Sequence, residues 1–273
     1  MSSAENSTST DKFQRFLDKE LYERHKILRF EQIYGKTWVS TGGQETTEEL
    51  FNELDLKSGM QMLDVGCGIG GSAFYAARKY GMLVNGIDLS RNMIGIANER
   101  RDEMSAGVRH RVQFHVEDAT SMEYPDSFYD MVYSRDAILH MDNKEILFKK
   151  FLHCLKPGGV LLITDYCRGD QEHGAQFKGY VKQRDYKFLA VQDYSNSLSR
   201  AGFGNVVAMD RTASCTAILK TELARYEQDK AVVLGKFSVE DYNAICDGWR
   251  GKIEKCSNGD LAWGYFKAQK MFD

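Results

Sequence analysis

The feature that most constrains the fold is a glycine-rich turn between a short apolar strand and a helix. The segment LDVGCGIGG places Gly66, Gly68 and Gly71 in the spacing G-x-G-x-x-G, directly after MLDV (62–65). The residues that follow, SAFYAARKY (72–80), are typical of a helix. Glycines at such a turn let the backbone approach a bound ligand closely. Taken alone, however, the motif is only a weak sign of dinucleotide binding.

Strand-like and helix-like segments alternate along the chain. Further strands are predicted at 83–88, 111–117, 129–134 and 159–166, and a helix at 91–101. This alternation predicts an α/β fold with a mainly parallel, doubly wound sheet, whose ligand lies beyond the carboxyl ends of the strands. Upstream, apolar residues at helical spacing predict one helix from Lys12 to Tyr34, ending at Gly35.

Short capping patterns predict where three helices begin. Ser90 precedes the helix at 91–101, and the pairs Thr46 with Glu49 and Asp142 with Glu145 have the spacing of a capping box. We therefore expect helices to start at these residues.

Composition excludes several classes of function. The 273 residues are 42% hydrophobic and 27% charged, with a net charge of −3, which gives no general attraction to nucleic acid or membranes. No apolar run has the length of a membrane span. The first residues, MSSAENSTST, lack the apolar core of a secretory signal, so residues 1–11 are expected to be a flexible polar tail. Six cysteines without a C-x-x-C pair indicate reduced thiols, no metal site and a cytoplasmic protein.

Three acidic residues point to the ligand. Asp64, Asp88 and Asp118 stand at or just after the ends of three successive predicted strands. An anion at Asp64 would repel a pyrophosphate but suits an ammonium group, Asp88 can accept both hydroxyls of a ribose, and Asp118 can accept from an adenine amine. A ligand with these groups and no phosphate is S-adenosylmethionine. A nicotinamide dehydrogenase is the competing interpretation of the glycine motif.

Four motifs carry a resemblance to a known superfamily. LDVGCGIGG, GIDLS, VEDAT and LKPGG, over residues 60–165, resemble the motif series of class I S-adenosylmethionine-dependent methyltransferases. The resemblance implies a Rossmann-like methyltransferase fold with an N-terminal helical lid. The cofactor residues that it implies are Val39, Ser40, Asp64, Gly66, Gly68, Asp88, Leu89, Asp118, Ala119 and Arg135.

Other segments resemble a narrower family. WVSTGG (38–43), YSRDAILH (133–140), ITDYC (163–167), VKQRDY (181–186), DGW (247–249) and WGYFKA (263–268) resemble the phosphoethanolamine (phosphobase) N-methyltransferases. That family adds one to three methyl groups to phosphoethanolamine, ending at phosphocholine, a precursor for phosphatidylcholine synthesis. The resemblance implies a single domain over 12–273, made of a lid (12–55), a cofactor-binding core (56–165) and a phosphobase-binding part (166–273).

The resemblance also implies how the substrate is held. Its phosphate needs fixed donors, and Tyr166, Arg184, Tyr186 and Lys252 would supply two hydroxyls and two cations. A sterol substrate would need an apolar pocket instead of these four side chains.

The substrate amine needs a group that takes or relays its proton, because an ammonium cannot attack a methyl group. His140 is the expected base, since the pKa of histidine lies near the working pH. The resemblance pairs it with Tyr22, expected to act as a latch when the lid closes. Asp136 is expected to face the amine or the sulfonium, and Arg135 to brace the cofactor. One departure from the family is Phe30, where several members carry a tyrosine.

Three alternatives stay open from the sequence. The chain could be a late-step specialist that acts only on methylated phosphobases, a methyltransferase for another small metabolite amine, or a protein that binds S-adenosylmethionine without turnover. A monomer is expected, with a small-molecule substrate, no nucleic acid and no membrane insertion.

Overall fold

The computed structural model describes residues 9–272 of the chain. Most of the tail expected over residues 1–11 lies outside the described residues, and the first helix already begins at Ser9. The chain divides into two compact units, and the division falls after Tyr133, inside one strand.

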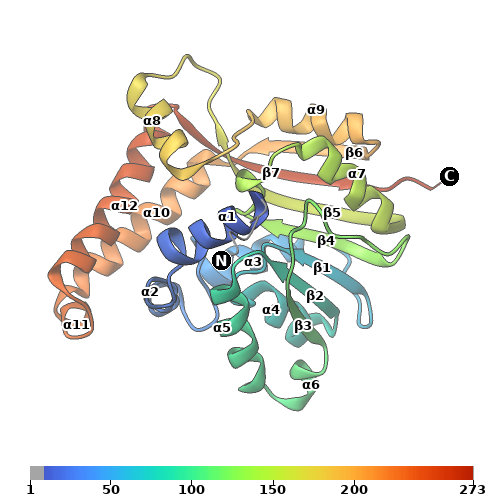
Figure 1. The fold of residues 1–273 in the computed structure, drawn as a ribbon, viewed down its shortest axis with the longest axis horizontal. Helices are drawn as coiled ribbons and strands as arrows, with labels where there is room; N and C mark the ends of the chain where they lie inside the picture. Colours follow the sequence, from blue (N-terminus) through green and yellow to red (C-terminus); the bar gives the residue numbers. More distant parts are fainter. Residues whose placement is uncertain (1–8, 273) are drawn as a thin grey trace, which may run out of the picture. The chain divides into compact units, whose positions relative to one another are not determined.

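The first unit carries the N-terminal helices and the strands around the glycine turn (Figure 1). Its helices are α1 (Ser9–Phe16), the π-helical turn η1 (Leu17–Leu21), α2 (Arg24–Tyr34), α3 (Gly43–Asn52), α4 (Gly71–Tyr80), α5 (Arg91–Asp102) and α6 (Ala106–Arg109). Its strands are β1 (Gln61–Val65), β2 (Leu83–Asp88), β3 (Val112–Val116) and most of β4 (Tyr129–Arg135).

The second unit carries the remaining elements. Its helices are the 3-10 turn η2 (Ile138–His140), α7 (Lys144–Cys154), α8 (Ala175–Arg184), α9 (Val191–Ala201), α10 (Thr212–Gln228), α11 (Lys230–Leu234) and α12 (Val239–Ser257). Its strands are β5 (Leu155–Arg168), β6 (Gly204–Asp210) and β7 (Leu261–Gln269).

The strands follow the order β3-β2-β1-β4-β5-β7-β6 in one seven-stranded sheet. Val84 of β2 pairs in parallel with Met62 of β1 and with Val112 of β3. β7 runs antiparallel to both of its neighbours, with Tyr265 opposite Thr164 of β5 and Met209 of β6. The predicted α/β class with a mainly parallel sheet is confirmed.

Burial follows from this architecture. Parallel strands that are covered on both faces read as continuous apolar runs, and β1 is buried along its length after its first residue. In the second unit, Tyr194 of α9 stacks on Phe266 of β7, with ring centroids 4.0 Å apart. All six cysteines are buried and are free thiols, as predicted. In the described part of the chain, no helix combines the length and apolarity that a membrane crossing requires.

The single helix predicted from Lys12 to Tyr34 is wrong, because the chain breaks in its middle. Tyr22 leaves the helical region with φ −121° and ψ 47°, and Glu23 is extended before α2 begins. The predicted end of α2 is confirmed, since Gly35 follows it with φ +100°. Tyr22 therefore stands at a helix end, where it packs against a buried cluster that includes Ile27 and Met93.

Of the three helix starts predicted from capping patterns, the structure confirms one. Ser90 caps α5 and its hydroxyl accepts a hydrogen bond from a backbone N–H at 3.2 Å, as predicted. Thr46 is not a cap, because α3 begins three residues earlier, behind Gly42. Asp142 is not a cap either, because Asn143 precedes α7 in the left-handed conformation.

Candidate functional site

The glycine turn after β1 is bent in a way that glycine adopts most readily. Gly66 and Gly68 have φ values of +72° and +54°. The N–H of Gly68 donates to Oδ2 of Asp88 at 3.0 Å, and the N–H of Ser90 donates to Oδ1 at 2.9 Å. The carboxylate that ends β2 therefore holds the turn that ends β1, so these predicted cofactor residues form one structure.

The loop that precedes α3 lies against the same turn. A methyl group added at Gly71 would come within 2.6 Å of the carbonyl oxygen of Thr37, and one at Gly68 would lie 3.2 Å from Val39. Since a side chain at either place would displace the loop, the glycines allow this close packing. The structure thus brings Val39, and with it Ser40, beside the turn.

The two acids at the ends of β1 and β2 differ in exposure, since Asp64 is buried and Asp88 is half-buried. Asp64 is only 2% exposed. Burial raises the pKa of Asp88 to about 6, against the opposing effect of the N–H groups of Ser90 and Gly68. Asp88 is therefore mostly ionised at pH 7 and becomes protonated below pH 6.

Asp118, which follows β3, is held by hydroxyl groups. Its Oδ1 accepts from the N–H and the hydroxyl of Thr120 at 2.9 and 2.6 Å, and its Oδ2 accepts from the hydroxyl of Thr10 at 3.0 Å. Burial acts to raise the pKa of Asp118, but these hydrogen bonds outweigh it and lower that pKa. The neighbouring Ala119 is buried.

The N-terminal helices contact the segment that follows β2. The amide of Gln14 donates to the carbonyl oxygen of Leu89 at 2.8 Å. The amide of Asn92 donates to the carbonyl oxygens of Asp18 and Tyr22 at 3.1 and 2.9 Å. The first part of the predicted lid segment is thereby tied to the residues after β2, which include the predicted cofactor residue Leu89.

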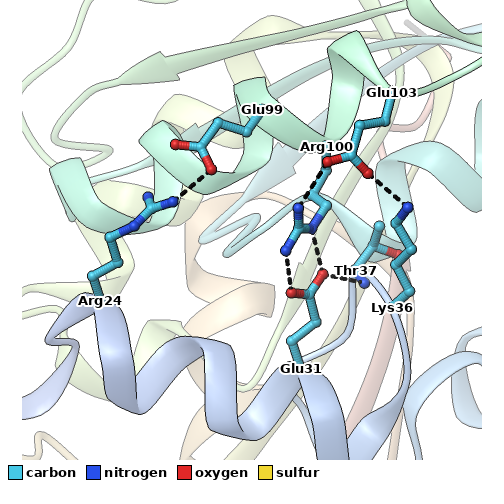
Figure 2. Close-up of polar contacts among 7 residues, drawn as sticks. All are labelled: Arg24, Glu31, Lys36, Thr37, Glu99, Arg100 and Glu103. Carbon is cyan, nitrogen blue, oxygen red and sulfur yellow. Dashed lines mark hydrogen bonds and ion pairs between the residues drawn. The ribbon is translucent and has the colours of Figure 1, made fainter.

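Ion pairs join α2 to α5 (Figure 2). Two nitrogens of Arg100 donate to the two carboxylate oxygens of Glu31, both at 2.6 Å, and the N–H of Thr37 donates to the same carboxylate at 2.9 Å. Nearer the start of α2, Arg24 pairs with Glu99 at 2.6 Å. The carboxylate of Glu31 therefore fixes both α2 and the loop that leads to Val39.

In the second unit, Asp136 adopts the left-handed conformation with φ +54°, which is uncommon for a residue other than glycine. Its N–H donates to the carbonyl oxygen of Thr164 at 2.8 Å. Its Oδ1 accepts from the indole N–H of Trp263 at 2.8 Å and from the hydroxyl of Thr164 at 3.2 Å. Residues of β5 and β7 therefore orient this carboxylate.

His140 ends the 3-10 turn η2, and its ring centroid lies 5.1 Å from that of Tyr186. Burial lowers the pKa of His140 to about 4; the charge of Lys144 acts in the same direction, and Asp185 opposes it. The expected reason for its role, a pKa near the working pH, is therefore wrong. The ring is nevertheless neutral at pH 7, and a neutral ring can accept a proton.

The residues expected at the phosphate lie in two groups. The ammonium of Lys252 donates to the hydroxyl of Tyr166 at 3.3 Å and lies 4.7 Å from its ring centroid. Arg184 ends α8, and Tyr186, two residues later, contacts His140.

Unlike the other predicted cofactor residues, Arg135 belongs to the second unit, where it is buried at the end of β4.

Several residues that contact the predicted site residues were not predicted from the sequence to have a role in the site. Trp263 stands in the motif WGYFKA and Thr164 in ITDYC, but only the paired strands show that both reach Asp136. Thr10 falls in the tail that is expected to be flexible, yet it contacts Asp118. No sequence signal marks these partners, because each contact joins residues 28 to 127 positions apart.

Comparison with known proteins gives the family. A family model described as a methyltransferase domain matches residues 56–230. Phosphoethanolamine N-methyltransferase 1 of Arabidopsis thaliana is 48% identical over 94% of this chain and 52% of that protein. Phosphoethanolamine N-methyltransferase of Plasmodium falciparum is 37% identical over 93% of this chain and 95% of that protein. This chain belongs to the phosphoethanolamine N-methyltransferase family. It spans about half the length of the plant family members that it matches.

Solved structures agree with this family. Phosphoethanolamine N-methyltransferase 2 of Haemonchus contortus, in complex with phosphomonomethylethanolamine and S-adenosylhomocysteine, has a TM-score of 0.91 and 35% identity, over 95% of this chain and 60% of that one. A sarcosine dimethylglycine methyltransferase from Galdieria sulphuraria, at a TM-score of 0.77 and 21% identity over 90% of this chain and 98% of that one, shares the fold. The competing dehydrogenase interpretation of the glycine motif is therefore wrong.

Proposed function

We propose that this chain is an N-methyltransferase that moves methyl groups from S-adenosylmethionine to the amine of phosphoethanolamine or of its methylated forms, toward phosphocholine. Family membership supports the proposal, as does the Haemonchus relative with a phosphobase in its solved structure. The observation that carries it is the composition of the second unit, where a neutral imidazole, an oriented carboxylate, two tyrosines and one cation come from the motifs of this family, and a second cation, Lys252, follows the motif DGW.

The residues of the first unit fit the methyl donor. S-adenosylmethionine supplies an electrophilic methyl group on a sulfonium sulfur. Asp64 would accept from its amino-acid ammonium, Asp88 from its ribose hydroxyls and Asp118 from its adenine amine. The fit is supported by the positive φ values of the glycine turn and by the half-buried carboxylate of Asp88, which already accepts two backbone N–H groups.

The substrate phosphate would be held by Lys252, Tyr166, Arg184 and Tyr186. A phosphate between Lys252 and Tyr166 would replace the weak 3.3 Å hydrogen bond between these two side chains with charge-assisted bonds. Arg184 adds a forked donor at the end of α8. These groups recognise an anion and would leave an unphosphorylated amine weakly bound.

The amine would be deprotonated through His140 and oriented by Asp136. Because Trp263 and Thr164 hold one oxygen of Asp136, the carboxylate can present a fixed negative charge to an ammonium. The low pKa of His140 keeps its ring neutral at pH 7, and suits it to relay a proton rather than retain it. The latch role of Tyr22 stays a prediction, for which Tyr22→Phe should slow turnover.

A late-step specialist is the second candidate. The observation that favours it is the Haemonchus structure, which holds phosphomonomethylethanolamine rather than phosphoethanolamine. Monomeric state and cytoplasmic location also stay predictions.

The test of this function is the requirement for the phosphate. We expect methyl transfer to phosphoethanolamine, or to its monomethyl form, to exceed transfer to the matching free amine by at least about 100-fold in kcat/KM, since two charge-assisted contacts are lost. Lys252→Met should raise KM about tenfold or more, while Lys220→Met, which removes an exposed cation of α10, should not. Equal rates with and without the phosphate would refute the proposal.

The role of His140 is tested separately. His140→Gln should abolish turnover and leave binding of S-adenosylhomocysteine unchanged by calorimetry, because all of the predicted cofactor residues except Arg135 belong to the first unit. His153→Gln, on α7, serves as the matched control and should retain activity. Full activity of His140→Gln would remove the base from the mechanism and leave the family assignment in place.

A further inference from the structure

The residue behind His140 is a buried lysine in an unusual place. Lys144 is 6% exposed and is the first residue of α7. Backbone N–H groups at the start of a helix carry partial positive charge, so a cation there is unfavourable. Burying a cation is unfavourable too unless hydrogen bonds and an opposite charge compensate it. A lysine that meets both conditions needs specific partners.

These partners are the backbone of the turn that carries His140. The ammonium of Lys144 donates to the carbonyl oxygen of Ile138 at 2.8 Å and to that of Met141 at 2.7 Å. The two carbonyls flank His140 in the sequence. The carbonyl of Leu139, between them, accepts from the N–H of Lys187 at 2.7 Å. The turn is therefore fixed by donors that come from outside it.

A buried carboxyl group on β5 completes this arrangement. Asp165 is fully buried, accepts from the hydroxyl of Tyr194 at 3.4 Å and accepts from the N–H of Leu139. Burial raises the pKa of Asp165, whereas the charge of Lys144 acts to lower it. The turn that carries His140 is thus held through its carbonyls by Lys144 and through an N–H by Asp165.

Building on the proposed function, we propose that Lys144 is a positioning residue for His140: its ammonium fixes the turn that carries the imidazole, and its charge keeps that imidazole neutral and able to accept a proton. In this role Lys144 does not contact the substrate. It acts through the backbone of the turn and through the electrostatic potential at the ring.

The charged groups around both residues define the electrostatics. His140 faces Lys144 of α7, Arg184 and Asp185 at the end of α8, and the hydroxyl-bearing ring of Tyr186. Two of these groups are cations and one is an anion, so the net potential favours the neutral ring.

Lys144 in turn faces Asp165 and Cys167 of β5, Asp142 before α7, and Lys187. Among these groups Asp165 acts most strongly on the pKa of Lys144. A substitution at Asp165 therefore separates the effect of this carboxyl group from the effect of the lysine on the ring.

The experiment is an NMR titration of His140 in the ligand-free protein, with the resonance assigned through His140→Gln. We expect Lys144→Met to raise the pKa of His140 by about one unit or more, because a neighbouring like charge is removed. Lys144→Arg, which keeps the charge, should leave that pKa within about 0.3 unit of the wild type. Lys149→Met, an exposed lysine of the same helix, is the matched control and should leave it unchanged.

Kinetics of methyl transfer give the second readout. Lys144→Met should lower kcat about 10-fold to 100-fold with little change in the KM of the phosphobase, because a displaced base slows the chemical step. Its pH profile should also move to higher pH, and Lys144→Arg should recover part of kcat. A merely structural role would lower the amount of folded enzyme and leave the pH profile of the folded fraction in place.

A second variant serves for the titration if Lys144→Met does not fold. The double variant Lys144→Met with Asp165→Asn removes the ammonium together with its carboxyl partner and retains an acceptor for the N–H of Leu139, so the same rise in the pKa of His140 is expected. An unchanged pKa in every folded variant without the lysine would overturn the proposal. A wild-type chain without methyl transfer would instead refute the proposed function, and the titration would still decide the role of Lys144.

Discussion

Two ion pairs that join the same two helices are expected to contribute differently to stability. Glu31 with Arg100 and Glu99 with Arg24 both connect α2 to α5 (Figure 2). The side chains of the first pair are 8% and 18% exposed, whereas those of the second are 50% and 48% exposed. The first pair is also bidentate, and its carboxylate accepts from the N–H of Thr37, whereas the second pair is a single hydrogen bond. The comparison therefore sets a buried, fully bonded pair against an exposed one.

The expected magnitudes follow from this burial. Arg100→Met leaves the carboxylate of Glu31 buried without its cation, which destabilises by about 3 kcal/mol or more. For a chain of this size that corresponds to a fall of about 6–12 °C in Tm. Arg24→Met removes an exposed pair and should destabilise by about 1 kcal/mol or less. The Glu31→Leu and Arg100→Met double variant should be more stable than the sum of the single effects predicts, because no unpaired charge remains.

Urea unfolding followed by circular dichroism measures these differences. The contribution of Glu31 also depends on pH: burial acts to raise its pKa, but Arg100 and the N–H of Thr37 outweigh that effect and lower it. The stabilisation is therefore present above the unfolded pKa of about 4.3 and is lost as the pH falls through the lowered value. Equal effects of Arg100→Met and Arg24→Met, or additive effects in the double variant, would refute this reasoning.

Three further predictions concern the candidate site. Because the pKa of Asp88 is about 6, the affinity for S-adenosylhomocysteine should fall about tenfold per pH unit below 6, and Asp88→Asn should remove this dependence; calorimetry that finds constant affinity from pH 5 to 8 would contradict the assignment. Gly70→Ala should destabilise by about 2 kcal/mol or more in urea unfolding, since φ is +91° and the added methyl would lie 2.6 Å from Phe114, and wild-type stability would show that the turn is not constrained as described. Thr164→Val should lower kcat about tenfold with little change in Tm, because Asp136 loses an orienting hydroxyl, and an unchanged kcat would argue against a role for that carboxylate.

Local signals made much of the fold predictable. The strand, glycine turn and helix around Gly66 and Gly68 lie where the motif places them, and Ser90 caps α5 because the capping pattern has no competing neighbour. The other capping patterns failed because a residue beside them, Gly42 or Asn143, adopted the left-handed conformation and started the helix elsewhere. Such competition between neighbours cannot be resolved from the spacing of polar residues.

The candidate site was predictable only where a residue belongs to a motif. His140 and Asp136 follow from their segment, but the groups that tune and orient them do not. Lys144 stands where the dipole of α7 disfavours a cation, so a sequence rule would assign it to solvent. Trp263 reaches Asp136 from a strand 127 residues further along the chain. Long-range pairing of this kind depends on the order of strands in the sheet.

The most direct test of the central claim is a product analysis. The protein is incubated with S-adenosylmethionine and, separately, with phosphoethanolamine and its monomethyl and dimethyl forms, and each product is identified by mass. We predict that at least one of the three gains methyl groups with release of an equal amount of S-adenosylhomocysteine. Turnover of all three would describe a complete route to phosphocholine, and turnover of the methylated forms alone a late-step enzyme. Failure of a folded protein that binds S-adenosylhomocysteine to methylate any of the three would contradict the proposed function.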